Sequence, residues 1–70
     1  MGSRAVPTRG TLRVPASSQC WVDGRLFFSK EARVFREWRE RHNENGLLLY
    51  VVRLPDGREV SVNSNHARVE

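Results

Sequence analysis

Aromatic and cationic side chains are the residues of this chain whose chemistry points to a ligand. Unpaired nucleic-acid bases stack on exposed aromatic rings, and arginine forms bidentate hydrogen bonds with phosphate. Phe27 and Tyr50 are candidates for stacking, because the strand faces expected to carry them are mixed. Arg25 shares a face with Phe27, a pairing that fits a nucleic-acid contact or an ordinary solvated rim. Periodicity places the other large aromatic residues in the core: Trp21, Phe28, Phe35 and Trp38.

Most of the excess positive charge lies at the N-terminus. The net charge is +4, and residues 1–13 contain three arginines (Arg4, Arg9 and Arg13) without an acidic residue. A basic arm can follow a phosphate backbone by releasing counterions. A solubilising tail, or an expression remnant at residues 1–3, explains the same composition.

The histidines and the single cysteine favour structural roles. His66 lies in a turn-prone segment, where it either contacts RNA or remains a surface histidine. His42 lies near the end of an expected helix, where a structural role is favoured. Cys20 has no partner for an intrachain disulfide, and one cysteine with two histidines falls short of the usual four zinc ligands. We therefore expect no metal.

Catalytic motifs are missing from the sequence. It contains no GxSxG, HExxH, P-loop or glycine-rich dinucleotide-binding motif. Glu37 and Glu40 are expected on the outer face of a helix, away from any pocket that would tune them for acid catalysis. A chain of 70 residues leaves little room for a closed active site. We expect no enzyme, no cofactor and no small-molecule substrate.

A β-hairpin is expected to position Arg25 and Phe27. Asp23-Gly24 between apolar runs predicts a type I′ turn, which needs positive φ at both central residues. The resulting register pairs Val22 with Arg25, Trp21 with Leu26, Cys20 with Phe27 and Gln19 with Phe28. We expect the face of Trp21, Leu26 and Phe28 to be the buried one, because Arg25 interrupts the other.

The segment at about 30–44 predicts one amphipathic helix. Its apolar stripe has spacings of three and four and consists of Val34, Phe35, Trp38 and His42. Ser29 can cap the start of this helix, and Gly46 can take the left-handed position after its end. Arg–Glu pairs four residues apart would add a few tenths of a kcal/mol each.

The remaining segments predict further strands. Residues 12–14 alternate as a short strand that Pro15 ends. Residues 47–54 are apolar on both alternating faces, which is typical of a central strand or of an interface between copies. Pro55-Asp56-Gly57 predicts a tight turn, after which Val60 and Val62 face inward, and a last short strand is expected near the C-terminus.

The end of the chain resembles the end of Sm-like proteins of the Hfq and Lsm type. In that family a one-turn 3₁₀ element joins the last two strands, strand edges pair into rings, and a Lys-His pair near the turn contacts uridine-rich RNA. Here Ser64-Asn65-His66-Ala67 occupies the similar place, so His66 matches and Asn65 replaces the lysine. The likeness covers residues 47–70, and the layout differs because Sm-like proteins place their helix before all five strands. The resemblance implies RNA binding and a variant small barrel.

These observations predict an α+β domain at residues 12–70 after a disordered basic arm at residues 1–11. The domain is expected to be a small, strongly bent antiparallel sheet or open barrel, Sm/SH3-like in shape, with one amphipathic helix at about 30–44. The leading hypothesis is a nucleic-acid-binding module, RNA before DNA. Its expected contact residues are Arg4, Arg9, Arg13, Arg25, Phe27, Tyr50, Arg53 and His66.

The alternative hypothesis is a protein-interaction or assembly module. In that case the apolar strand at 47–54 and an open sheet edge would pair with another chain. A single basic face would favour nucleic acid, whereas dispersed Arg–Glu pairs around an apolar patch would favour protein. Because so short a chain buries little surface, we also expect self-association into a homo-oligomer. The sequence has no secretion signal and no membrane-spanning run, so we expect a cytoplasmic location without membrane binding.

Overall fold

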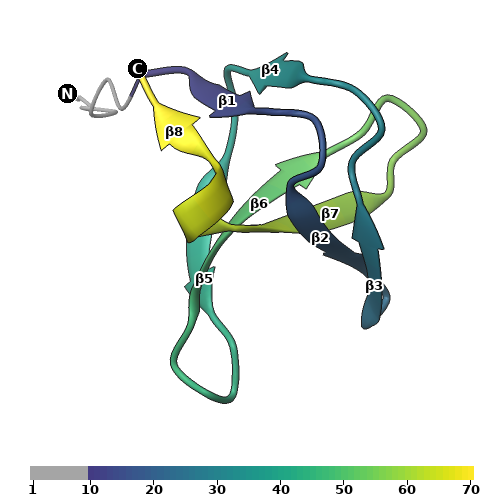
Figure 1. The fold of residues 1–70 in the computed structure, drawn as a ribbon, viewed down its shortest axis with the longest axis vertical. Coiled ribbons are helices and arrows are strands. Elements are labelled where there is room, and N and C mark those ends of the chain that lie inside the picture. Colours follow the sequence, from purple (N-terminus) through teal and green to yellow (C-terminus); the bar gives the residue numbers. More distant parts are fainter. Residues whose placement is uncertain (1–9) are drawn as a thin grey trace, which may run out of the picture.

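Short antiparallel strands build the whole fold in the computed structural model, which describes residues 10–70 (Figure 1). The strands are β1 (Leu12–Val14), β2 (Gln19–Val22), β3 (Arg25–Phe28), β4 (Arg33–Phe35), β5 (Arg39–His42), β6 (Leu48–Arg53), β7 (Glu59–Asn63) and β8 (Arg68–Val69). A 3₁₀ turn, η1 (Ser64–His66), joins β7 to β8. One sheet has the order β3-β2-β7-β6-β5 and the other β4-β1-β8.

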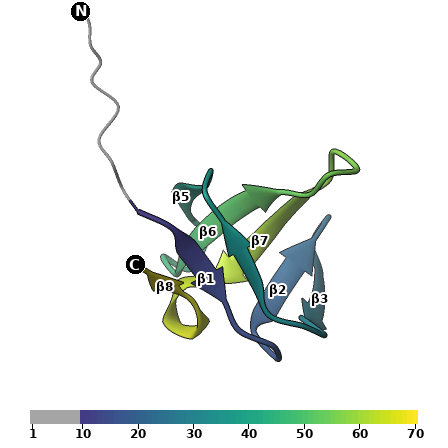
Figure 2. The same ribbon diagram turned by 90° about the horizontal axis from the view of Figure 1, so that it is seen from above.

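The core lies between these two sheets. Leu12 and Val14 of β1 point toward buried side chains of the five-stranded sheet, which are Cys20, Val52, Val60 and Val62. Figure 2 shows β1 and β4 side by side, with β6, β7 and the β2–β3 hairpin beyond them. The described chain therefore forms two antiparallel sheets packed on each other, and of the predicted architecture the small antiparallel sheet is confirmed.

The predicted helix at about 30–44 is wrong. Residues 33–35 pair with β1 and residues 39–42 pair with β6, so the segment crosses from one sheet to the other. An isolated helix of this length is marginal in water, and pairs of opposite charge add little to it, so backbone pairing with β1 and β6 prevails. The fold is therefore β rather than α+β.

The helical spacing still identified two of the core residues. Phe35 and Trp38 pack against the core cluster, whereas Val34 is 54% exposed and His42 is exposed. Successive residues of a strand point to opposite sides, so Val34 faces solvent when Phe35 faces the core. Ser29, expected as a helix cap, instead donates through its Oγ to the carbonyl of Pro15 at 2.8 Å.

The first hairpin has the predicted turn and register. Asp23 has φ 52° and Gly24 has φ 79°, and the four strand pairs are those expected from the sequence. The predicted buried face is wrong, because Cys20 is 2% exposed while Leu26 and Phe28 are 51% and 56% exposed. Arg25 does not exclude its own face from the core, since it lies next to the turn and reaches solvent there.

The second hairpin follows the prediction closely. Strand β6 is paired on both sides, with β5 and with β7. Consecutive residues Val51 and Val52 are both buried, in agreement with an apolar strand that is covered on both faces. In the turn Gly57 has φ 93°, and the N–H of Leu54 donates to the carbonyl of Arg58 at 2.8 Å.

The C-terminal end supplies the third strand of the smaller sheet. The 3₁₀ turn η1 lies where the resemblance implied one, and β8 then pairs with β1. Thr11, placed by the prediction in the arm, exchanges two backbone hydrogen bonds of 2.8 Å with Glu70. The rest of the predicted arm, residues 1–9 with Arg4 and Arg9, lies outside the described residues.

Candidate functional site

Strand β3 is an apolar strand at the edge of the five-stranded sheet (Figure 1). In the described part of the chain its sole sheet neighbour is β2. Leu26, Phe27 and Phe28 follow one another along this edge, and Phe27 is 39% exposed. An exposed apolar edge strand is a template for pairing with another chain, and soluble proteins usually protect such edges.

The backbone of β3 presents free hydrogen-bonding groups to solvent. In an antiparallel pair, hydrogen-bonded and non-hydrogen-bonded residue pairs alternate. The N–H of Ser29 donates to the carbonyl of Ser18 at 3.0 Å, which fixes the phase of this alternation. Phe27 therefore bonds to β2, whereas the N–H and C=O groups of Leu26 and Phe28 point away from it. These groups are placed to receive an added strand.

The other edge strands lack this combination. Strand β5, at the opposite edge of the same sheet, reads Arg-Glu-Arg-His and is exposed throughout. Charged side chains on an edge oppose the addition of another strand. Strands β4 and β8, at the edges of the smaller sheet, contain three and two residues. The free backbone and the apolar side chains thus coincide at β3.

A cavity of about 350 Å³ opens beside β3. Its floor is formed by buried core residues, and its walls by Phe27, Phe28, Phe35 and Leu54. The floor residues are Val14, Cys20, Val52, Val60 and Val62. Such a mostly apolar cavity that reaches the core is suited to an apolar side chain or ligand group.

Charged residues surround the mouth of this cavity. Lys30 and Glu31 line it from the segment that joins β3 to β4, and Arg33 lines it from the start of β4. All three are exposed, and none of them forms an ion pair with a described residue. The mouth therefore has a net positive charge, with two cations available to a ligand.

Cys20 at the floor of the cavity is held as a thiol. Burial raises the pKa of Cys20, and a backbone hydrogen bond from Ser29 opposes this effect in part. The Sγ–H donates to the carbonyl of Ser18 at 3.4 Å, a contact that requires the proton. A protonated buried thiol is a weak nucleophile, so Cys20 serves as an apolar lining residue.

The predicted nucleic-acid-binding residues that lie within residues 10–70 are spread over several strands and the 3₁₀ turn. Arg25 and Phe27 lie close together on β3, where they line a shallow pocket with Val22 and Leu26. Arg13 is bonded instead to Glu70, at 3.0 Å, on the smaller sheet.

Tyr50 and His66 both contact other parts of the fold, Tyr50 half-buried and His66 on the surface. The ring of Tyr50 meets that of Trp38 edge to face at 5.2 Å, and Tyr50 packs against the core cluster. The Nδ1 of His66 accepts a hydrogen bond from the backbone N–H of Gln19 at 3.1 Å. This contact ties η1 to the start of β2, which gives His66 a structural role in the fold.

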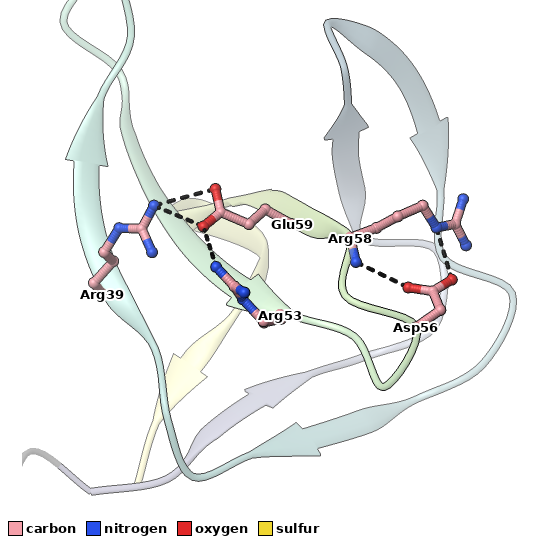
Figure 3. A network of polar contacts seen from close by, with 5 residues as sticks. All are labelled: Arg39, Arg53, Asp56, Arg58 and Glu59. Carbon is pink, nitrogen blue, oxygen red and sulfur yellow. Dashed lines mark hydrogen bonds and ion pairs between the residues drawn. The ribbon is translucent and has the colours of Figure 1, made fainter.

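Arg53 belongs to a network of ion pairs across three strands (Figure 3). The carboxylate of Glu59 on β7 accepts from Arg39 of β5 at 3.1 Å and from Arg53 of β6 at 3.2 Å. Hydrogen bonding and charge, first from Arg39 and then from Arg53, hold the pKa of Glu59 below its usual value. In the next turn Arg58 bonds Asp56 at 2.8 Å. Arg39, Arg53 and Arg58 are thus each paired with an acidic side chain.

A polar groove lies between the tip of the β2–β3 hairpin and the turn that joins β5 to β6. It has a volume of about 620 Å³, and Trp21, Arg41 and Leu49 are among its lining residues. Trp21 is half-buried, while Arg41 is exposed and forms no ion pair with a described residue. The groove brings an aromatic ring and a cation together, a combination that sequence reasoning did not find because it expected Arg41 on a helix.

The structure and the comparisons add three further findings. Within residues 10–70 no cluster of three or more histidine, cysteine or acidic side chains is arranged to hold a metal ion, and no helix has the length and apolarity to cross a membrane. Comparison of the chain with protein-family models, curated proteins and solved structures finds no match. Function is therefore inferred from the geometry of the chain itself.

Proposed function

We propose that this protein is an interaction module that binds an extended segment of another protein by strand addition at β3. The observation that supports this proposal is the exposed edge at Leu26–Phe28, where free backbone groups and apolar side chains coincide. In strand addition the main-chain hydrogen bonds supply affinity, and alternate side chains supply specificity.

The distribution of charge favours a protein ligand over nucleic acid. Ion pairs between arginine and acidic residues occur on both sheets, at Arg13–Glu70, Arg39–Glu59 and Arg53–Glu59. The largest exposed apolar residues cluster on β3. A patch of this kind among dispersed charge pairs is typical of protein contact surfaces.

Selection from a displayed library of random 12-residue peptides tests this proposal. We expect peptides that bind in extended form and that shift the NMR amide signals of Leu26 and Phe28. In an added strand only every second backbone N–H faces β3. Methylation of those nitrogens in a selected peptide should abolish binding, whereas methylation of the intervening nitrogens should leave binding intact. A library without binders, or binders that map away from β3, would refute the proposal.

A pair of proline variants provides a matched test on the protein. Leu26→Pro removes an N–H that points away from the sheet at β3. Glu40→Pro does the same at β5, because the bond from the N–H of Asn43 to the carbonyl of Leu47 sets the alternation there. Proline is tolerated at such edge positions.

Both proline variants should therefore fold, with unchanged circular dichroism. The loss of one hydrogen bond, net about 0.5–1.5 kcal/mol, weakens peptide binding roughly two- to tenfold in Leu26→Pro. Glu40→Pro should bind as the wild type does. Equal binding by both variants contradicts strand addition at β3, and the methylation series decides the matter if Leu26→Pro fails to fold.

Nucleic-acid binding is the second candidate, and the groove with Trp21 and Arg41 supports it. Bases stack on aromatic rings, and an arginine nearby can contact phosphate. Fluorescence anisotropy with labelled single-stranded RNA and duplex DNA at two salt concentrations tests this candidate. It predicts binding that weakens with salt and on Arg41→Gln. Absence of binding at low salt removes the candidate.

A further inference from the structure

The cavity beside β3 indicates which extended segment this edge accepts. We infer that the ligand is an acidic-apolar peptide strand, in which one large apolar side chain enters the cavity and a carboxylate two residues away, on the same side of the strand, contacts Lys30 and Arg33. This inference rests on the proposed strand addition at β3 and adds the chemistry of the partner.

The geometry of strand pairing brings a ligand side chain to the cavity. Alternate residues of an added strand lie on the same side of the sheet as Phe27, whose ring lines the cavity. Residues directly opposite one another in an antiparallel pair have Cβ atoms about 5 Å apart. The ligand residue opposite Phe27 therefore lies at the cavity mouth. The residues directly before and after it in the ligand strand point to the opposite face of the sheet.

The size and lining of the cavity fit a leucine or an aromatic side chain. Its volume of about 350 Å³ exceeds that of an apolar cavity of about 150 Å³, which is enough to bind benzene. The floor at Val60 and Val62 is buried and apolar. A polar ligand side chain would lose its contacts with water there without gaining a partner.

The charge at the cavity mouth selects for an acidic residue on the same side of the ligand strand as the apolar one. Lys30 and Arg33 line the mouth without an ion pair to a described residue, and Glu31 cancels one of these two charges. A carboxylate on the ligand would meet the remaining positive charge, whereas a lysine would meet repulsion.

Charge also argues against a second copy of this chain as the occupant. Pairing of β3 with β3 of another molecule would present the sequence Arg-Leu-Phe-Phe, which contains a cation and no acid. It would also bring two positively charged cavity mouths toward each other. A heterologous acidic strand is therefore the better match.

Isothermal titration of a designed peptide tests the inference. The probe is a nine-residue peptide of alternating threonine and valine with Phe at position 5 and Asp at position 7, which lie on the same side of the strand. Phe→Ala in the probe should weaken binding roughly tenfold to hundredfold, which is the usual effect of losing one buried aromatic side chain. Asp→Lys should weaken binding about fivefold at low salt and less at high salt.

Variants of the protein provide the reciprocal tests. Arg33→Glu should weaken binding of the Asp probe and strengthen binding of the Lys probe, because Arg33 is exposed and the change leaves the core intact. Leu54→Trp should fill the half-buried wall of the cavity and reduce binding at least about tenfold, as expected from loss of a buried aromatic anchor. Leu48→Trp is the matched control, since Leu48 is a half-buried leucine outside the cavity and should leave binding unchanged.

The outcomes separate the inference from the proposed function. If binders remain sensitive to Leu26→Pro but not to changes in the Phe and Asp of the probe or in Leu54, strand addition stands and the acidic-apolar ligand is wrong. If peptides bind without any response to Leu26→Pro or to backbone methylation, both proposals are wrong. Dimerisation that competes with the probe would identify a second copy as the occupant and overturn the inference.

Discussion

Replacement of Leu12 by alanine tests the two-sheet core most directly. Leu12 is fully buried in β1, the central strand of the smaller sheet, where it lies opposite Phe35 of β4 and Val69 of β8. Its side chain contacts the valine cluster of the larger sheet. The substitution therefore opens a cavity at the place where the two sheets meet.

The size of the effect follows from burial. Leu→Ala at fully buried positions costs about 2.7–5 kcal/mol. A domain of this length has a total stability of about 3–10 kcal/mol, at roughly 0.05–0.15 kcal/mol per residue. We expect Leu12→Ala to lose about half of the stability or more. In urea unfolding followed by tryptophan fluorescence, the midpoint should fall in proportion, with little change in the slope.

Val34→Ala is the control for this experiment. Val34 lies on the neighbouring strand β4, opposite Arg13, and its side chain faces solvent. Its replacement should change the unfolding free energy by no more than about 0.5 kcal/mol. If Val34→Ala lowered the unfolding free energy as much as Leu12→Ala does, Val34 would have to be buried. The assignment of residues 33–35 to strand β4 would then be wrong.

Two further predictions concern a backbone contact and a charge network. Gly10 has φ 93°, and a Cβ there would come too close to the carbonyl of Glu70, whereas Gly46 has a similar φ of 85° with open space around it. Gly10→Ala should therefore lower the melting temperature more than Gly46→Ala does. Equal shifts would show that backbone conformation alone determines the effect. The pKa of Glu59 is lower in the folded state than its usual value of about 4.5, so its stabilising effect is present at neutral pH and is lost as the pH falls through the folded pKa. Glu59→Gln should therefore reduce stability at pH 7 and flatten its dependence on pH between about 6 and 3, as measured by thermal unfolding; an unchanged pH profile would contradict a folded-state role for the two arginine contacts.

The turns of this chain could be predicted because single residues determine them. Asp23-Gly24 and Pro55-Asp56-Gly57 restrict the backbone locally, and a two-residue type I′ turn then fixes the register of its strands. The pairing of Cys20 with Phe27 follows from this local chemistry alone. Alternating apolar residues likewise identified Val60 and Val62 as core residues.

The local sequence pattern could not distinguish a helix from two strands in the segment at 30–44. Spacings of three and four between Val34, Phe35 and Trp38 fit a helix, but a strand that bends between two sheets can bury the same pair of aromatic residues. The difference is made by partners distant in sequence, since Leu12 pairs with Phe35 and Val51 pairs with Arg39. No sequence window around residue 35 contains these partners.

The buried face of the first hairpin, and with it the candidate site, also depended on tertiary pairing. Both faces of the hairpin carry apolar residues, and Arg25 was taken to exclude its face from the core. Cys20 instead pairs with Val62 of β7, and this contact turns Cys20 inward and leaves Leu26 and Phe28 exposed. The unbroken apolar run Leu26–Phe28 at a strand edge was the signal in the sequence that pointed to this surface.

The charged residues of the segment at 30–44 acquire a different meaning once the segment is read as strands. In a helix, Arg36 and Glu40 would pair with one another along one surface. In the structure β5 presents Arg39, Glu40 and Arg41 along a sheet edge, and a row of charges opposes pairing with another chain. The same sheet thus has one edge closed by charge and one edge left open and apolar. Protection against aggregation would require charge at both edges, and the proposed partner strand would account for the apolar composition of β3.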